Sequence, residues 1–74
     1  MRDRQGNLLS DKDVRAAFGS LVDDIGREDA AEVIGISVRT VMRAVEHGRV
    51  SQATLDKLFD AWDREAAAQY DYWY

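Results

Sequence analysis

The spacing of apolar residues constrains the fold of this chain more than any other feature of its sequence. Ser10 and Asp13 form a capping-box pattern, and Gly26 is a residue type that commonly ends a helix. Between them, apolar residues recur at intervals that place them on one face of a helix: Val14, Phe18, Leu21, Val22 and Ile25. We therefore predict a first helix between Ser10 and Gly26.

Two short helices are predicted next, over residues 27–34 and 38–46. Gly35 ends the first of them, and Ser37 is a suitable N-cap for the second. The second ends before Gly48, because glycine readily adopts the left-handed conformation common just past a helix end. Three apolar residues of the first short helix are expected to face inward: Ala30, Val33 and Ile34.

A fourth helix is predicted from Ser51 to the alanines at 66–68, with apolar residues at helical spacing: Leu55, Leu58, Phe59 and Trp62. The pattern as a whole indicates one all-α domain over residues 10–69. A flexible arm is expected over residues 1–9, and an aromatic tail over residues 70–74.

Composition narrows the class of protein. A chain of 74 residues has room for one small core, so we expect self-association, most simply as a homodimer. Because there is no cysteine, neither disulfides nor a cysteine zinc site can stabilise the fold. The sequence has no apolar run long enough to cross a bilayer and no signal-peptide pattern, so we expect a cytoplasmic protein without a membrane partner.

The charge is unevenly distributed along the chain. The total is −4, which at first argues against binding to nucleic acid. Residues 35–53 are the exception, because Arg39, Arg43 and Arg49 face a single acid there, Glu46, for a net charge of +2. The basic stretch includes the third predicted helix.

The segment over residues 27–46 meets the requirements of a helix-turn-helix unit. Such a unit needs a small residue where its helices touch and a glycine where the chain turns sharply. Ala31 and Gly35 satisfy these needs, and the apolar contacts between the helices are expected from four residues: Ile34, Ile36, Val41 and Ala44. Polar side chains are left pointing outward, among them Arg39, Thr40, Arg43 and Glu46.

The string REDAAEVIGISVRTVMRAVEHGRVSQATLDKL resembles the phage-repressor and Cro-like helix-turn-helix family, of the xenobiotic-response-element type. Val50 stands where members often carry proline, and Gly26 with Arg27 replaces their usual capped start with glutamine. The resemblance rests on residues in register: Ala31, Gly35, Ile36, Ser37, Thr40, Val41, Arg43, Glu46, Gly48, Ser51, Thr54 and Leu55. It implies a lambda-repressor-like domain of four to five helices.

The resemblance also implies a function, that of a sequence-specific transcription regulator, most simply a repressor, in a prokaryote or phage and associated with the nucleoid. The helix at 38–46 would lie in the major groove of double-stranded DNA, with Val38, Arg39 and Arg43 contacting bases. A dimer would occupy a palindromic operator with half-sites about 34 Å apart, without cofactor or metal. Phosphate contacts are expected from Arg27, Ser37, Thr40, His47, Arg49 and Ser51.

The aromatic C-terminal end leaves alternatives open. Trp62, Tyr70, Tyr72, Trp73 and Tyr74 either fold back on their own domain or form a homodimer contact. Base stacking is a weaker alternative, because Asp71 and the terminal carboxylate repel phosphate.

The same residues allow functions other than DNA binding. Exposed arginines are ordinary on a solvated helix face, and His47 is more simply a partner of the helix dipole than a catalytic base. The carboxylates lack a histidine cluster, so no enzyme is indicated. The principal alternative is a helix-turn-helix fold used for protein contact, such as an antitoxin or adaptor whose acidic C-terminal half binds a protein partner.

Overall fold

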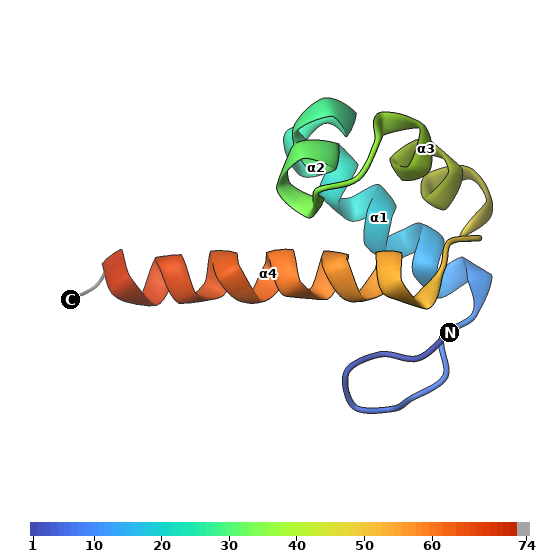
Figure 1. Ribbon diagram of the computed structural model, residues 1–74, viewed down its shortest axis with the longest axis horizontal. Helices are drawn as coiled ribbons and strands as arrows, with labels where there is room; N and C mark the ends of the chain where they lie inside the picture. The colour runs from blue at the N-terminus through green and yellow to red at the C-terminus, as the bar shows by residue number, and fades with distance from the viewer. Residues whose placement is uncertain (73–74) are drawn as a thin grey trace.

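The computed structural model describes residues 1–72 of the chain, and side chains for residues 1–64. The described part is helical, as predicted, with its helices in the order α1 (Asp11–Ile25), α2 (Arg27–Ile34), α3 (Val38–His47) and α4 (Gln52–Tyr72) (Figure 1). Three helices, α1 to α3, form a compact group on one side of the N-terminal half of α4. The all-α prediction is therefore confirmed.

The start of α1 has the predicted capping box. Ser10 Oγ accepts a hydrogen bond from the Asp13 N–H at 3.2 Å, and the Asp13 carboxylate accepts one from the Ser10 N–H at 3.0 Å. The backbone N–H and the hydroxyl of Ser10 together hold the pKa of Asp13 below its ordinary value. These bonds satisfy amides that the first turn of a helix otherwise leaves without partners.

The core is formed by apolar residues from all four helices. The largest fully buried side chains are Phe18, Leu55, Leu58, Val14 and Val41. Smaller residues fill the spaces between α2, α3 and α4: Ala30, Ala31, Ala44 and Ala61. Their size allows the helix backbones to approach closely, as the sequence predicted for Ala31.

The inward prediction for Val33 is wrong. Its side chain is 36% exposed, whereas Ala30, Ala31 and Ile34 provide the buried face of α2. Ala30, Ala31 and Ile34 form the buried stripe of this eight-residue helix, and position 33 lies at the edge of that stripe. Arg64 of α4 donates a hydrogen bond to the Val33 carbonyl at 3.0 Å, so it is the backbone of this residue that contacts α4.

Two glycines determine how α3 is connected. Gly35 ends α2 in the left-handed region with φ 83° and ψ 36°, and Gly48 ends α3 there with φ 67° and ψ 16°. The surroundings of the two differ, because a Cβ on Gly35 would meet no neighbour, whereas one on Gly48 would overlap the backbone carbonyl of Asp11. The chain after α3 is thus held against the first turn of α1.

The first nine residues, expected to form a flexible arm, are folded back as a closed loop. Arg2 and Leu8 form an antiparallel bridge, and the Leu9 N–H donates to the Met1 carbonyl at 2.8 Å. Gln52 at the start of α4 bonds both the N–H and the carbonyl of Arg2, at 2.8 and 2.7 Å. Arg4 forms ion pairs with Asp60 and Asp63 of α4. The loop is therefore joined to α4 at two places.

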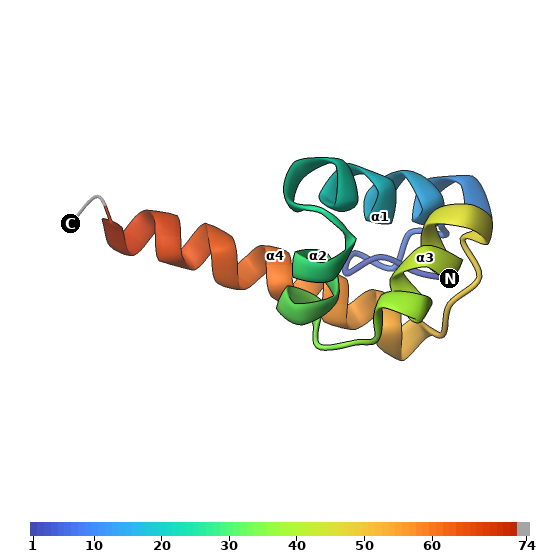
Figure 2. The same ribbon diagram turned by 90° about the horizontal axis from the view of Figure 1, so that it is seen from above.

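The C-terminal half of α4 extends well beyond the other helices, in both views of the molecule (Figures 1 and 2). The helix continues to Tyr72, past the predicted end at residues 66–68. The side chains of Tyr70 and Tyr72, and all of Trp73 and Tyr74, lie outside the described residues. In the described part of the chain, no helix combines the length and the apolar character required to cross a membrane.

Candidate nucleic-acid interface

Helix α3 has one buried and one exposed face. Val41 and Ala44 are fully buried against α1 and α2, and Ile36 packs on the same core from the turn. The opposite side of the helix carries exposed polar residues, which we call the α3 face: Arg39, Arg43, Glu46 and His47. The buried face fixes the rotation of α3 about its axis, so the side chains of Arg39 and Arg43 point outward.

The same capping device begins both α3 and α4. Ser37 Oγ accepts from the Thr40 N–H at 3.1 Å, and Ser51 Oγ accepts from the Thr54 N–H at 3.2 Å. In each pair the two hydroxyl oxygens are 2.9 Å apart, and either can be the donor. The hydroxyl bond uses one hydrogen of each pair, so the other hydrogen is free to donate. Each helix therefore presents a hydroxyl donor at its positive end, where an anion is stabilised.

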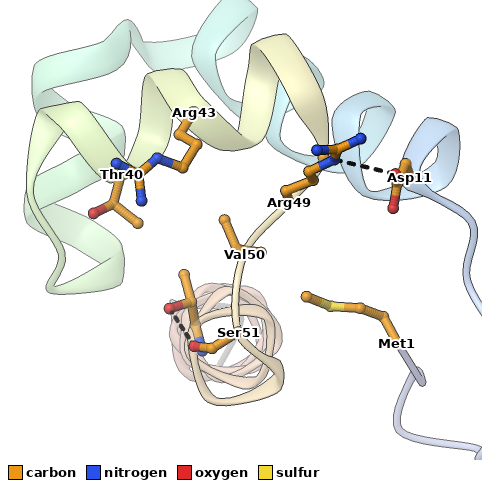
Figure 3. A pocket seen from close by; sticks show the side chains of 9 residues that line it. Met1, Asp11, Thr40, Arg43, Arg49, Val50 and Ser51 are labelled. Atoms are coloured by element: carbon orange, nitrogen blue, oxygen red, sulfur yellow. Dashed lines mark hydrogen bonds and ion pairs between the residues drawn. The ribbon is translucent and has the colours of Figure 1, made fainter.

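A depression of about 520 Å³ lies between α3, the linker after it and the start of α4 (Figure 3). We call it the α3–α4 depression. Thr40 and Arg43 border it from α3, and Ser51 from the N-terminus of α4. The remaining lining residues are Met1, Asp11, Gly48, Arg49, Val50 and Thr54. Four residues predicted from the sequence are thus brought together: Thr40, Arg43, Arg49 and Ser51.

Arg49 is the member of this group with a carboxylate beside it. Its Nε lies 3.9 Å from Oδ2 of Asp11, with side chains 81% and 64% exposed. In Figure 3 the guanidinium of Arg49 points towards Asp11, and that of Arg43 points towards Thr40. The two cations consequently diverge, although both border the same depression.

A shallower depression of about 210 Å³ follows α3 itself and is lined by Arg39, Met42, Arg43, Glu46 and His47. Arg43 belongs to both depressions and so connects the α3 face with the N-terminus of α4. His47 lies in the last turn of α3, with its Nε2 3.8 Å from Oε2 of Glu46.

The other predicted site residues lie apart from these depressions. Val38 is 36% exposed in the first turn of α3, next to its cap Ser37. Arg27 is exposed at the start of α2 and lines neither depression. Trp62 is 37% exposed on α4, with its ring centroid 5.7 Å from that of Phe59. The other predicted dimer residues fall where no side chain is described.

Sequence reasoning missed several residues that border the α3–α4 depression. Thr54 had a usable signal, since Ser51 and Thr54 repeat the spacing of Ser37 and Thr40. Asp11 and Met1 had none, because they are distant in sequence and are placed only by the packing of α1 and of the N-terminal loop.

Two kinds of feature, a metal-ligating cluster and a buried polar group, are absent among the described side chains. Among them there is no group of three or more histidine, aspartate or glutamate side chains suited to hold a metal ion. No polar or charged side chain in this part of the chain is buried. The side chains that line the two depressions supply guanidinium, hydroxyl and imidazole groups at an exposed surface.

Comparison of this chain with protein-family models, with curated proteins and with solved structures produced no match. The function is accordingly inferred from the chain's own residues and their geometry.

Proposed function

We propose that this protein binds double-stranded DNA in a sequence-specific manner and regulates transcription, most simply as a repressor. One observation carries the proposal: Arg39 and Arg43 lie exposed, one turn apart, on a helix whose opposite face is fixed in the core by Val41 and Ala44. A helix seated in this way, after a short turn from a preceding helix, can enter the major groove.

Base contacts follow from the chemistry of the α3 face. An arginine guanidinium can donate two hydrogen bonds to O6 and N7 of guanine, which favours that base by about 1–3 kcal/mol. Val38, exposed in the first turn, is suited to contact with a thymine methyl group. Arg39, Arg43 and Val38 would therefore determine which sequence is bound.

Phosphate contacts would come from the margins of that helix. Thr40, Ser51 and Arg49 border the α3–α4 depression, where one DNA strand would pass. His47 and Ser37 lie at the two ends of α3, and Arg27 lies at the positive end of α2. Such contacts fix position on the duplex without distinguishing sequences.

A dimer on a palindromic operator completes the proposal. The projecting half of α4 has no packing partner among α1 to α3 (Figure 1), and a helix end without tertiary contacts has little stability in water. Trp62 adds an exposed aromatic ring on the same helix. Pairing of α4 with α4 of a second copy would bury both.

The proposal is tested by selecting bound duplexes from random DNA with the full chain. We expect a palindromic consensus, and a binding constant whose log-log salt slope is about −0.9 for each phosphate contacted. Arg39→Ala and Arg43→Ala should each relax the preference at one guanine per half-site. Arg15→Ala, an exposed arginine of α1, is the matched control and should leave the consensus unchanged.

A second function, as a protein-interaction module such as an antitoxin or adaptor, is favoured by a different surface. A depression of about 240 Å³ combines Phe59 and Trp62 with Asp3, Gln5 and the Arg4–Asp63 ion pair, and suits a partner with an apolar side chain flanked by polar ones. Salt-insensitive or absent DNA binding, together with a tight protein complex that Trp62→Ala weakens, would favour this function over the first.

A further inference from the structure

One carboxylate opposes the positive charge of the arginines at the α3–α4 depression. Asp11 is the one acid among the residues that line the depression, and it faces Arg49 across 3.9 Å. A DNA phosphate entering the depression would meet two arginines, Thr40 and the Ser51–Thr54 pair, but also this carboxylate. Phosphate and carboxylate have the same charge and prefer the same donors, so they compete for Arg49.

The packing of the linker after α3 against the first turn of α1 fixes the position of Asp11. The linker residue Gly48 lies so close to the Asp11 carbonyl that a Cβ would overlap it. This close approach brings Arg49, the next residue, beside the first turn of α1. Asp11 is not needed for the capping of that turn, because the capping box uses Asp13. Its carboxylate is therefore available to Arg49.

We infer that Asp11 is an affinity-limiting residue, which engages the guanidinium of Arg49 until a DNA phosphate takes the place of the carboxylate. The inference rests on the proposed function and adds a regulatory residue to it. Figure 3 shows the arrangement, with Arg49 turned towards Asp11 and Arg43 turned towards Thr40. Because phosphates are common to all sequences, Asp11 lowers affinity for every duplex equally and leaves the ranking of sequences unchanged.

The test compares Asp11→Asn with Asp23→Asn, an exposed acid of α1 that lines none of the depressions described above. Both variants remove one negative charge, so they change long-range attraction to DNA equally. Affinity for the selected duplex and for a scrambled duplex is measured over a range of salt concentrations, and thermal unfolding shows that each variant is folded.

For Asp11→Asn we expect a gain of about three- to tenfold at low salt, on both duplexes, with the log-log salt slope unchanged, because Arg49 contacts one phosphate in either protein. Asp23→Asn should gain less and keep the original slope. In an Arg49→Ala background the gain from Asp11→Asn should fall to that of Asp23→Asn, because the competed cation is gone.

Two results would count against this inference, and they are distinguishable. If the unsubstituted protein binds DNA and Asp11→Asn gains no more than Asp23→Asn, Asp11 does not limit affinity, although the proposed function stands. If the unsubstituted protein binds no duplex at any salt concentration, the proposed function fails and the role of Asp11 fails with it.

Discussion

Two surfaces of this molecule carry exposed arginines, and they differ in what surrounds those arginines. On the α3 face, no carboxylate among residues 1–64 lies within ion-pair distance of Arg39 or Arg43. On the opposite surface, Arg4 of the N-terminal loop is held by Asp60 and Asp63 of α4. The hydrogen bond that Arg4 donates to Asp60 and the nearby acids raise the pKa of Arg4, so its guanidinium stays charged and is offset by these carboxylates.

The difference shows why a net charge of −4 does not decide the partner of this protein. Two acids pair with Arg4, which joins the N-terminal loop to α4, whereas no acid among residues 1–64 pairs with Arg39 or Arg43. Since DNA attracts cations that lack an internal partner, the proposed DNA surface is the α3 face and not the loop surface. Asp11 beside Arg49 is an intermediate case at the margin of the α3 face.

The largest expected effect tests this comparison directly. Replacing Arg39 and Arg43 together by glutamate should lower DNA affinity by about a thousandfold or more, because two bidentate donors become repelling acids. Arg4→Glu makes the same kind of charge change on the loop surface and should leave affinity within a few-fold. The measurement is fluorescence anisotropy with the selected duplex. Equal losses of DNA affinity from the substitutions on the α3 face and on the loop surface would show that the two surfaces do not differ in DNA binding.

The next effect concerns the linker that joins the α3 face to the rest of the fold. Gly48→Ala should destabilise the protein by about 3 kcal/mol, because a left-handed conformation and an overlap with the Asp11 backbone add together. Gly35→Ala also places a side chain in the left-handed region, but in open space, and should cost only about 1 kcal/mol.

Both glycine variants are measured by urea unfolding. Similar midpoints for the two would show that the close approach at Gly48 is readily relieved, and it would then have no part in placing Arg49 beside Asp11.

A smaller effect is expected from the caps beside the depression. Ser37→Ala removes the acceptor of the Thr40 N–H and should cost about 1 kcal/mol of stability. If the Ser37 hydroxyl also contacts DNA, the variant should lose DNA affinity even under conditions in which it is fully folded. Ser20→Ala, at an exposed position inside α1, should change neither quantity. Unfolding and anisotropy data on the same samples separate the two contributions.

The smallest effect concerns the loss of stability at acidic pH. It involves Asp13 at the start of α1, away from the arginines. The pKa of Asp13 is lowered in the folded chain, so its ionised form stabilises the native state above the ordinary pKa of aspartate. That stabilisation is lost as the pH falls through the lowered pKa. Asp13→Asn should therefore flatten the decline in unfolding midpoint towards low pH. If the unfolding midpoint of Asp13→Asn declines towards low pH as it does in the unsubstituted protein, other carboxylates cause the decline.

Much of the fold was predictable because its signals are local. Ser10 with Asp13 marked the start of α1, Gly35 and Gly48 marked the ends of α2 and α3, and Ser51 preceded α4. Each of these signals depends on hydrogen bonds or dihedral angles within a few residues, so no distant contact was needed to recognise it. The outward position of Arg39 and Arg43 followed from the apolar face opposite them.

The errors and omissions have a common cause in packing. Val33 was expected inside on its hydrophobicity, but the narrow contact between α2 and its neighbours left it at the edge. The loop at residues 1–9 has no periodic pattern, yet it is closed by bonds to Gln52 and by the ion pairs of Arg4. These partners lie at the other end of the chain and carry no local signal.

By itself, the sequence determined the number and order of the helices, their caps, and which side of α3 faces solvent, since these depend on spacing and on neighbouring residues. Tertiary structure alone decided which charges meet: Asp11 with Arg49, and Arg4 with Asp60 and Asp63. An ion pair acts through space over a few ångströms and is indifferent to distance along the chain. It therefore becomes visible only when the helices have been packed.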